Sequence, residues 1–149
     1  MEILIEDRQN RHRIDHEKIV KKAGIILDAL RFPEGELSIL IVSDPEMAEL
    51  NKTYLHRSGP TNVIAFPMHE GPFSDVTPNL LGDLVICLDA AAREAQNAAV
   101  TIEARFDQLL VHGIVHLFGF DHEETSEEAE AMRIKEEQLL GLLQSEKES

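Results

Sequence analysis

Apolar residues follow two different periods along this chain. Four short runs alternate or are continuously apolar, which predicts β-strands over residues 2–6, 36–43, 62–66 and 80–88. Five longer stretches repeat apolar residues every three to four positions, which predicts helices over residues 15–31, 44–55, 89–98, 101–118 and 125–143. We therefore predict an α/β (α+β) fold, in which a mixed sheet of about four strands is packed with about five helices.

The stretch over residues 101–118 has apolar side chains on most of its sides, which is typical of a buried helix. Thr101 is placed to cap its first turn. Gly119 is placed to end it, because glycine readily takes the left-handed conformation that terminates many helices. The proline-rich segment 67–79 is expected to be a loop or a lid.

The length of 149 residues suits one domain with one core, and no repeat or linker divides it, so residues 1–149 are expected to form a single domain. No apolar stretch approaches the roughly 20 residues that span a bilayer, so we expect no membrane segment. Cys87 is the only cysteine, which excludes an intrachain disulfide and makes the cytoplasm the expected location. Its apolar neighbours predict a small core residue.

The formal net charge of −14 argues against general attraction to nucleic acid, since phosphate backbones attract basic surfaces. The charge is uneven, because residues 1–62 sum to −2 and residues 63–149 to −12. Six basic residues stand close together near the N-terminus: Arg8, Arg11, Arg13, Lys18, Lys21 and Lys22. They form either a local basic groove or the solvated face of a helix.

Three of the seven histidines fall within eleven residues, in the segment HGIVHLFGFDH at 112–122. His112 and His116 are four residues apart, so on a helix they share one face with Cβ atoms about 5–6 Å apart. A turn at Gly119 would bring His122 back as a third ligand. Three imidazoles with one open position form the ligand set of a catalytic zinc. We predict one zinc ion per chain on these histidines, although nickel and copper also suit imidazole; the alternative is a helix end that is merely rich in histidine.

Zinc proteases of related spacing carry a glutamate directly after the first histidine, where it acts as the general base. This chain has Gly113 at that position, so peptide hydrolysis would lack its base. Glycine costs a helix interior about 0.5–1 kcal/mol relative to alanine. The position is therefore expected to need space, either for a closely packed neighbour or for a bulky ligand near the metal.

Arg57 is the candidate for binding an anionic substrate group. It lies in the segment HRSGPTN, where glycine and proline impose a defined turn, and arginine makes paired hydrogen bonds to phosphate or carboxylate. An ordinary surface arginine is the alternative. Asp121 either orients a ligand histidine or caps the local turn. Asp83 interrupts an apolar strand, so it either faces solvent or has a buried partner.

These residues resemble the YbeY endoribonucleases, also described as ribosomal RNA maturation factors, over nearly the whole chain. Residues 112–122 are similar to the signature His-Gly-x-x-His-Leu-x-Gly-Tyr-Asp-His, with Phe120 in place of tyrosine. Three further features fit the family pattern: Arg57 followed by PTNVIAFP at 60–67, LGDLVIC at 81–87, and Met132. Asn62 departs from the family pattern, in which aspartate is usual at this position. If that aspartate acts in proton transfer, activity here would be reduced or differently arranged. If it only holds the loop, asparagine can do much the same by hydrogen bonding.

The resemblance implies a metal-dependent endoribonuclease that prefers single-stranded RNA and processes ribosomal RNA near the 3′ end of the small-subunit RNA. It also implies ribosome quality control and contacts with small-subunit ribosomal proteins or assembly factors. On this hypothesis zinc activates a water or polarises a phosphate oxygen, while Arg57 acts as the catalytic residue that holds the scissile phosphate. Attack by the RNA 2′-hydroxyl is a second route.

Two other functions stay open from the sequence. One is a metal hydrolase that acts on a peptide or a small phosphoester and takes its base from elsewhere in the chain. The other is a non-enzymatic ribosome assembly factor whose metal only stabilises the fold. The acidic surface suits this second role, because basic ribosomal proteins are natural partners for it.

Overall fold

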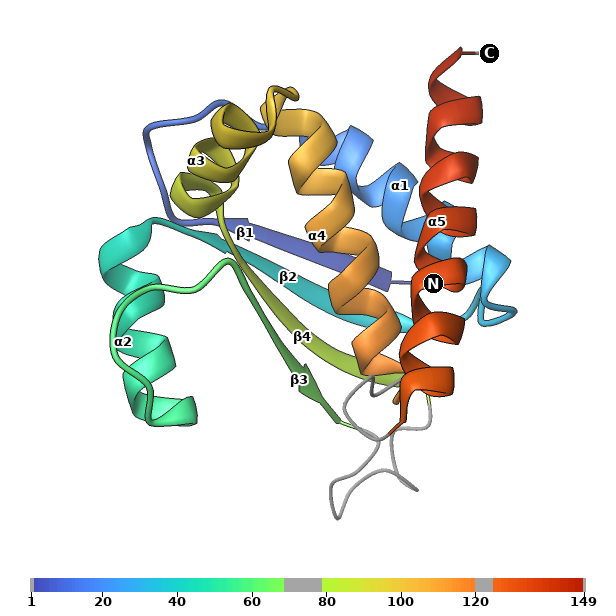
Figure 1. Cartoon of the computed structure of the whole chain (residues 1–149), viewed down its shortest axis with the longest axis horizontal. Helices are drawn as coiled ribbons and strands as arrows, with labels where there is room; N and C mark the ends of the chain where they lie inside the picture. Colours follow the sequence, from blue (N-terminus) through green and yellow to red (C-terminus); the bar gives the residue numbers. More distant parts are fainter. Residues whose placement is uncertain (1, 69–78, 120–124, 149) are drawn as a thin grey trace.

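The computed structural model describes residues 2–68, 79–119 and 125–148 (Figure 1). Its elements follow in the order β1 (Glu2–Asp7), α1 (His16–Ala29), β2 (Glu36–Val42), α2 (Asp44–Leu55), β3 (Val63–Pro67), β4 (Leu80–Cys87), α3 (Leu88–Ala98), α4 (Ile102–Leu117) and α5 (Ser126–Glu148). The four strands and five helices of the described residues confirm the predicted α+β class and its mixed sheet. None of these helices has the length and apolar content that crossing a bilayer requires.

The sheet has the strand order β1-β2-β4-β3. The first three strands of this order are parallel to one another, with Ile5 opposite Ile39 and Ile39 opposite Leu84. Strand β3 runs antiparallel to β4 and pairs Ala65 with Leu84. It forms one edge of the sheet, next to the histidine-bearing helix α4.

The two faces of the sheet carry different apolar clusters, because successive side chains of a strand point to opposite sides. On one face Ile39, Leu84 and Ile86 pack with α1, α4 and α5 in the larger cluster. On the other face Val42, Ile64 and Val85 pack with Met47 and Leu50 of α2. Figure 1 shows α4 and α5 side by side, with α2 set apart from them. Helix α4 has eight buried residues between Phe106 and Leu117, as its apolar sequence predicts.

A close approach between α4 and the sheet explains Gly113. A Cβ atom at this position would lie 2.6 Å from Cδ2 of Leu84 and 3.3 Å from Cγ2 of Val63. These separations are shorter than ordinary carbon–carbon contacts of about 3.5–4.0 Å. Of the two explanations that the sequence leaves open, a closely packed neighbour is therefore the one that the structure supports.

The end of one helix differs from the sequence prediction, whereas α2 spans the predicted residues. Helix α5 extends to Glu148 instead of Leu143, because the residues after the apolar pattern are mostly good helix formers (Gln, Glu and Lys). The residue before the first turn of α2 is Ser43, in extended conformation, and Asp44 is the first helical residue. Asp44 does not cap the helix with its side chain; it pairs with Arg93 at 2.5 Å.

Candidate functional site

Helix α4 holds the histidine pair between two well-formed ends. At its start the Thr101 hydroxyl accepts a hydrogen bond of 3.0 Å from the Ala104 N–H. At its end Gly119 has a φ of +85°, the left-handed conformation expected there. His112 and His116 are half-buried on the same side of the helix, so the two rings have restricted positions.

The two imidazoles point their Nε2 atoms toward one another. These atoms are 3.0 Å apart, and the ring centroids are 4.4 Å apart with the planes at 75°. Two nitrogens bound to one tetrahedral zinc at about 2.0–2.1 Å are separated by roughly 3.3 Å. The pair therefore already has nearly the spacing that a shared metal ion needs. This agreement, together with the donor chemistry of imidazole, makes the two residues fit a zinc ion.

Glu136 of α5 fixes the orientation of His112. Its Oε1 atom lies 2.5 Å from Nδ1 of His112. Because a carboxylate only accepts hydrogen bonds, this contact assigns the proton to Nδ1 and leaves the lone pair of Nε2 directed at His116. A carboxylate behind a histidine in this way is the usual support of a metal-bound imidazole.

Glu136 was not among the residues singled out from the sequence, although a signal for it exists. It stands four residues after Met132 and three before Leu139, both of which are buried. It therefore lies on the buried side of α5, where a carboxylate requires a partner. From the sequence, Asp121 was the residue considered for such a supporting role, with a cap of the local turn as the alternative.

His122 and Asp121 lie outside the described residues, so the third predicted ligand stays a prediction. Within the described residues no group of three or more histidines, cysteines or carboxylates is placed to hold a metal ion. The structure thus brings together two of the three predicted ligands, and it adds the carboxylate of Glu136 behind one of them.

A hollow of about 350 Å³ opens beside His112, between α4, α5 and the start of β3. Two arginines line it. Arg105 is held by Glu94, at 2.9 Å from Nε to Oε1, and by Gln108. Arg133 pairs with Glu130 and Glu137, and these contacts, that with Glu130 first, raise the pKa of its guanidinium. The hollow therefore combines an imidazole with two guanidinium groups, a group that binds phosphate in many proteins, and each guanidinium here is already paired with a carboxylate.

Arg57 lies apart from this hollow. It is exposed in the segment after α2, where it lines a different hollow of about 680 Å³ with Glu49, Lys52 and His56. Its backbone N–H donates to the carbonyl of Asn51 at 3.3 Å, so the segment has the defined turn that its sequence predicts. The described residues do not bring the Arg57 side chain to His112, and its catalytic role stays a prediction.

Comparison with known proteins identifies the family. A model of the family described as "Endoribonuclease YbeY" matches residues 4–144. The chain belongs to the YbeY endoribonuclease family. The endoribonuclease YbeY of Geobacter metallireducens is 44% identical over 147 residues, which is 98% of each chain. That of Geobacter sulfurreducens is 43% identical over 97% of each chain, and that of Aquifex aeolicus is 41% identical over 89% of this chain and 87% of its own.

The fold agrees with this assignment. A solution structure of a Thermotoga maritima protein superposes with a TM-score of 0.65 and covers 97% of this chain and 90% of its own. Its sequence is 24% identical, so this likeness supports the architecture alone. The family membership confirms the resemblance that the sequence shows.

Asn62 is one of the two positions named above at which this chain departs from the YbeY pattern, and the structure gives it a partner. Its Nδ2 atom donates to both carboxylate oxygens of Glu94, at 3.3 and 3.2 Å. The same carboxylate binds Arg105 at the edge of the hollow. A neutral amide suits this place, because an aspartate would set one carboxylate against another. Asn62 therefore helps to hold the start of β3 against α3.

Two other residues that the sequence singled out have plain structural positions. Cys87 is buried, and burial raises the pKa of its thiol to about 11, so it is protonated at neutral pH and serves as a core residue, as predicted. Asp83 is exposed on the sheet and accepts a hydrogen bond of 2.5 Å from the Ser38 hydroxyl. It thus faces solvent, which was one of the two possibilities.

Proposed function

We propose that this protein is a metal-dependent endoribonuclease that cleaves single-stranded ribosomal RNA precursors, in maturation of the small-subunit RNA 3′ end and in ribosome quality control. Membership of the YbeY family supports RNA as the substrate. The observation that carries the metal-dependent part is the pair of Nε2 atoms 3.0 Å apart, with Glu136 behind His112. The proposed cellular location of this activity is the cytoplasm.

His112, His116 and His122 are the residues that would hold a zinc ion. When bound, such an ion supplies a Lewis acid and lowers the pKa of a bound water toward roughly 7. Glu136 keeps the proton on Nδ1 of His112, and so keeps Nε2 available as a ligand. It also supplies negative charge behind the ring, which makes Nε2 a stronger electron-pair donor to a metal ion.

Positioning of the RNA phosphate is assigned to arginine. Arg105 and Arg133 line the hollow beside His112, and their guanidinium groups supply fixed positive charge near the histidines. Arg57 stands on a defined turn with its side chain exposed, so it is available to a bound strand. Product ends distinguish the two chemical routes: a 2′,3′-cyclic phosphate indicates attack by the RNA 2′-hydroxyl, and a 5′-phosphate indicates attack by water.

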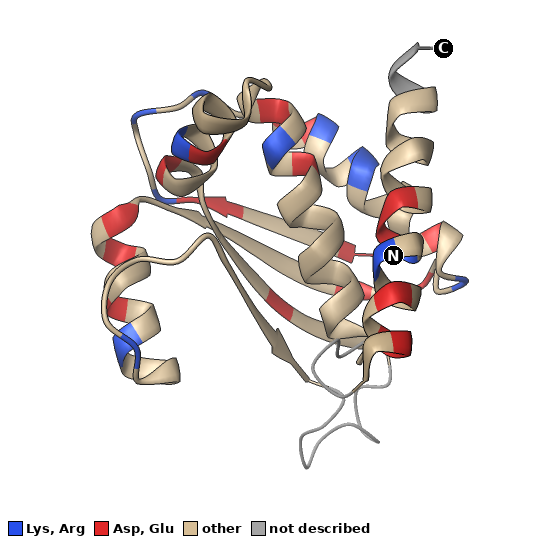
Figure 2. Cartoon of the chain, viewed as in Figure 1, with Lys and Arg blue, Asp and Glu red and all other residues tan. Residues whose placement is uncertain are grey.

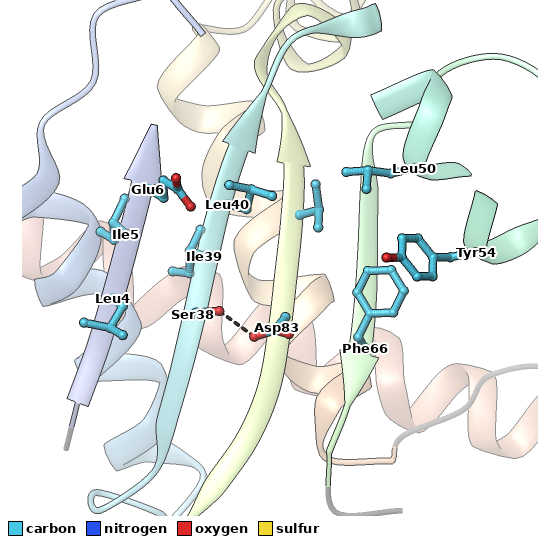
Figure 3. Close-up of a pocket in the computed structure, with 11 residues that line it drawn as sticks. Leu4, Ile5, Glu6, Ser38, Ile39, Leu40, Leu50, Tyr54, Phe66 and Asp83 are labelled. Atoms are coloured by element: carbon cyan, nitrogen blue, oxygen red, sulfur yellow. Dashed lines mark hydrogen bonds between the residues drawn. The ribbon is translucent and has the colours of Figure 1, made fainter. Parts of the chain in front are cut away.

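The proposed protein partners are basic small-subunit ribosomal proteins or assembly factors, and an open face of the sheet suits them. A groove of about 500 Å³ lies on the face that α2 only partly covers, and Figure 3 shows the side chains that line it. Its exposed apolar groups include Leu4 and Tyr54, which are 59% and 60% exposed. Glu6 and Asp83 add negative charge beside them. An apolar groove with acidic groups favours a basic partner.

The first experiment measures zinc binding and RNA cleavage on the same preparations. We expect His116→Ala to lose both zinc binding and RNA cleavage. Glu136→Gln should weaken zinc about 10–100-fold in a competition titration with a chromophoric chelator, because His112 loses its supporting carboxylate. Cleavage of a single-stranded fragment of small-subunit RNA should fall in parallel. Glu130→Gln, an exposed change on the same helix, is the matched control and should bind zinc as the unchanged protein does.

Three results would contradict this proposal. Unchanged zinc affinity in Glu136→Gln would remove the assigned role of that carboxylate. Absence of zinc from carefully prepared protein would remove the metal centre. Zinc binding without cleavage, over a range of RNA fragments, would favour the assembly factor whose metal only stabilises the fold.

A further inference from the structure

Another hollow, of about 410 Å³, lies around the first turn of α4, away from the histidine pair. We call it the basic hollow. Its cationic side chains come from the segment after β1 and from α1: Arg11, Arg13, Lys18 and Lys22. Its apolar floor consists of Ile14, Ile19, Leu88, Ile102 and Phe106. The apolar groups come from the segment before α1 and from α1, α3 and α4, and together with the cations they make the hollow amphipathic.

The carboxylates near the basic hollow are already engaged. Asp15 accepts the backbone N–H of Lys18 at 3.2 Å as the cap of α1. Glu103 and Asp107 bind Nζ of Lys22 at 3.0 and 2.8 Å. Those two contacts outweigh the effect of burial, which by itself lowers the pKa of Lys22, and the net result is a raised pKa. Lys22 is thus a charged, structural member of the wall.

Two of the cationic side chains that line the basic hollow are available to a ligand. Arg13 and Lys18 are exposed, and within the described ranges no carboxylate pairs with either side chain. Arg11 differs, since its Nη1 atom lies 3.9 Å from the buried carboxylate of Asp89. Figure 2 shows Lys and Arg along this segment and α1. Residues 8–22 hold six Lys and Arg against two Asp and Glu in a chain whose net charge is −14.

The shape and chemistry of the basic hollow fit a phosphodiester strand. Arginine and lysine bind phosphate oxygens, and the floor offers apolar surface to a nucleobase or ribose, with Ile102 39% exposed. Proteins that bind single strands combine a cationic groove with aromatic side chains on which bases stack; in the basic hollow the aliphatic side chain of Ile102 supplies the exposed apolar surface instead. A site for a free phosphate would need the cations but no apolar floor.

The position on α4 links the basic hollow to the histidine pair. Phe106 of the floor precedes His112 by six residues, which is about 9 Å along the helix axis. Arg105, next to Phe106 in the chain, lines the other hollow. The two hollows therefore flank the same N-terminal half of α4.

We propose that the basic hollow is an RNA-binding exosite, which holds the phosphodiester backbone of a single-stranded substrate several nucleotides from the bond that is cut. The assignment rests on the proposed function for its substrate. The exosite gives a strongly acidic protein one local surface where RNA binds, so the rest of the molecule need not attract nucleic acid.

The test compares Arg13→Gln/Lys18→Gln with a control of equal charge change, Arg31→Gln/Lys135→Gln, whose residues do not line the basic hollow. Binding of a labelled 2′-O-methyl strand, which keeps every phosphate and resists cleavage, is measured by fluorescence anisotropy over a range of salt. The slope of log K against log salt is negative, and removing two single-strand phosphate contacts should reduce its magnitude by about 1.4. The control should leave the slope unchanged.

Cleavage kinetics give the second readout. For a strand of roughly 16 nucleotides, which is long enough to cover a single-strand binding surface, the double variant should raise KM severalfold and leave kcat unchanged. For a strand of roughly 4 nucleotides, KM should not change. An unaltered salt slope, or equal loss in the control, overturns the exosite and leaves the nuclease intact. Binding of adenosine monophosphate as tightly as the strand would also overturn it, and would indicate a small phosphate ligand.

The design separates failure of the exosite from failure of the proposed function. If no variant cleaves RNA, the proposed function fails, and the anisotropy titration still decides whether the basic hollow binds a strand. If the unchanged protein cleaves RNA and the double variant binds the long strand equally well, the exosite alone is wrong. The hollow would then be available to an acidic protein partner.

Discussion

Asn62, Glu94 and Arg105 form a small network at the edge of the histidine hollow. The amide of Asn62 and the guanidinium of Arg105 both donate to the carboxylate of Glu94. A neutral side chain at position 62 lets Glu94 serve both partners without charge repulsion. The residue type at position 62 is therefore matched to Glu94, and the departure from the YbeY pattern has a local physical reason.

Asn62→Asp tests this match. The new carboxylate would stand at hydrogen-bond distance from that of Glu94, so we expect about 0.5–1 kcal/mol of destabilisation at pH 7. Repulsion raises the pKa of one carboxyl, and the loss should shrink as pH falls and that carboxyl is protonated. The measurement is urea unfolding at pH 7 and pH 4. In a Glu94→Gln background the same substitution should cost almost nothing, and a loss that persists there would show that repulsion is not the cause.

At the scale of elements, the contact between α4 and the sheet sets the position of the histidines. Gly113 lies between His112 and His116 in this helix and faces Leu84 of β4 and Val63 of β3. Both methyl groups of Leu84 lie within 3.2 Å of the place of an added Cβ. Leu84 is fully buried, so its side chain has no free space into which to turn.

Gly113→Ala should therefore destabilise the protein by about 1–2 kcal/mol, because overpacking outweighs the gain in helix propensity. Zinc affinity should fall as well, since α4 must move away from the sheet. Gly141→Ala is the control, because a Cβ there meets no atom within 4 Å; it should stabilise α5 by up to about 1 kcal/mol. Thermal unfolding and zinc titration check both variants. Equal stabilisation by the two substitutions would refute the packing argument.

At the scale of the whole molecule, the two faces of the sheet differ in what covers them. One face is covered by α1, α4 and α5 and supports the histidine pair. The other carries the open groove, where Tyr54 of α2 meets Phe66 of β3 edge to face, with ring centroids 5.5 Å apart (Figure 3). The proposed function therefore places catalysis and protein contact on opposite sides of one sheet.

Leu4→Ser/Tyr54→Ser should weaken binding to a basic small-subunit protein about tenfold or more, because exposed apolar groups at the centre of an interface carry much of its affinity. Purified ribosomal proteins, tested one at a time by biolayer interferometry, provide the measurement. Val100→Ser/Ile134→Ser removes exposed apolar groups elsewhere and is the control. If the groove variant binds every such protein as the unchanged chain does, the partner surface lies elsewhere.

The sequence by itself determined much of this molecule, because local periodicity and capping are properties of neighbouring residues. The four strands, the five helices, the cap at Thr101 and the left-handed end at Gly119 were all predicted from spacing. So was the shared face of His112 and His116, since a four-residue separation fixes it on any helix. The family signature was likewise present in the chain itself.

The tertiary structure alone decided what depends on residues far apart in the sequence. The partnership of Glu136 with His112 spans 24 residues and exists only because α5 packs beside α4. The reason for Gly113 required the position of Leu84, and the role of Asn62 required the position of Glu94 in α3. The basic hollow also arises in this way, because its cations belong to α1 and the segment before it, whereas its floor includes α3 and α4. Packing, which no local pattern encodes, brings these groups together.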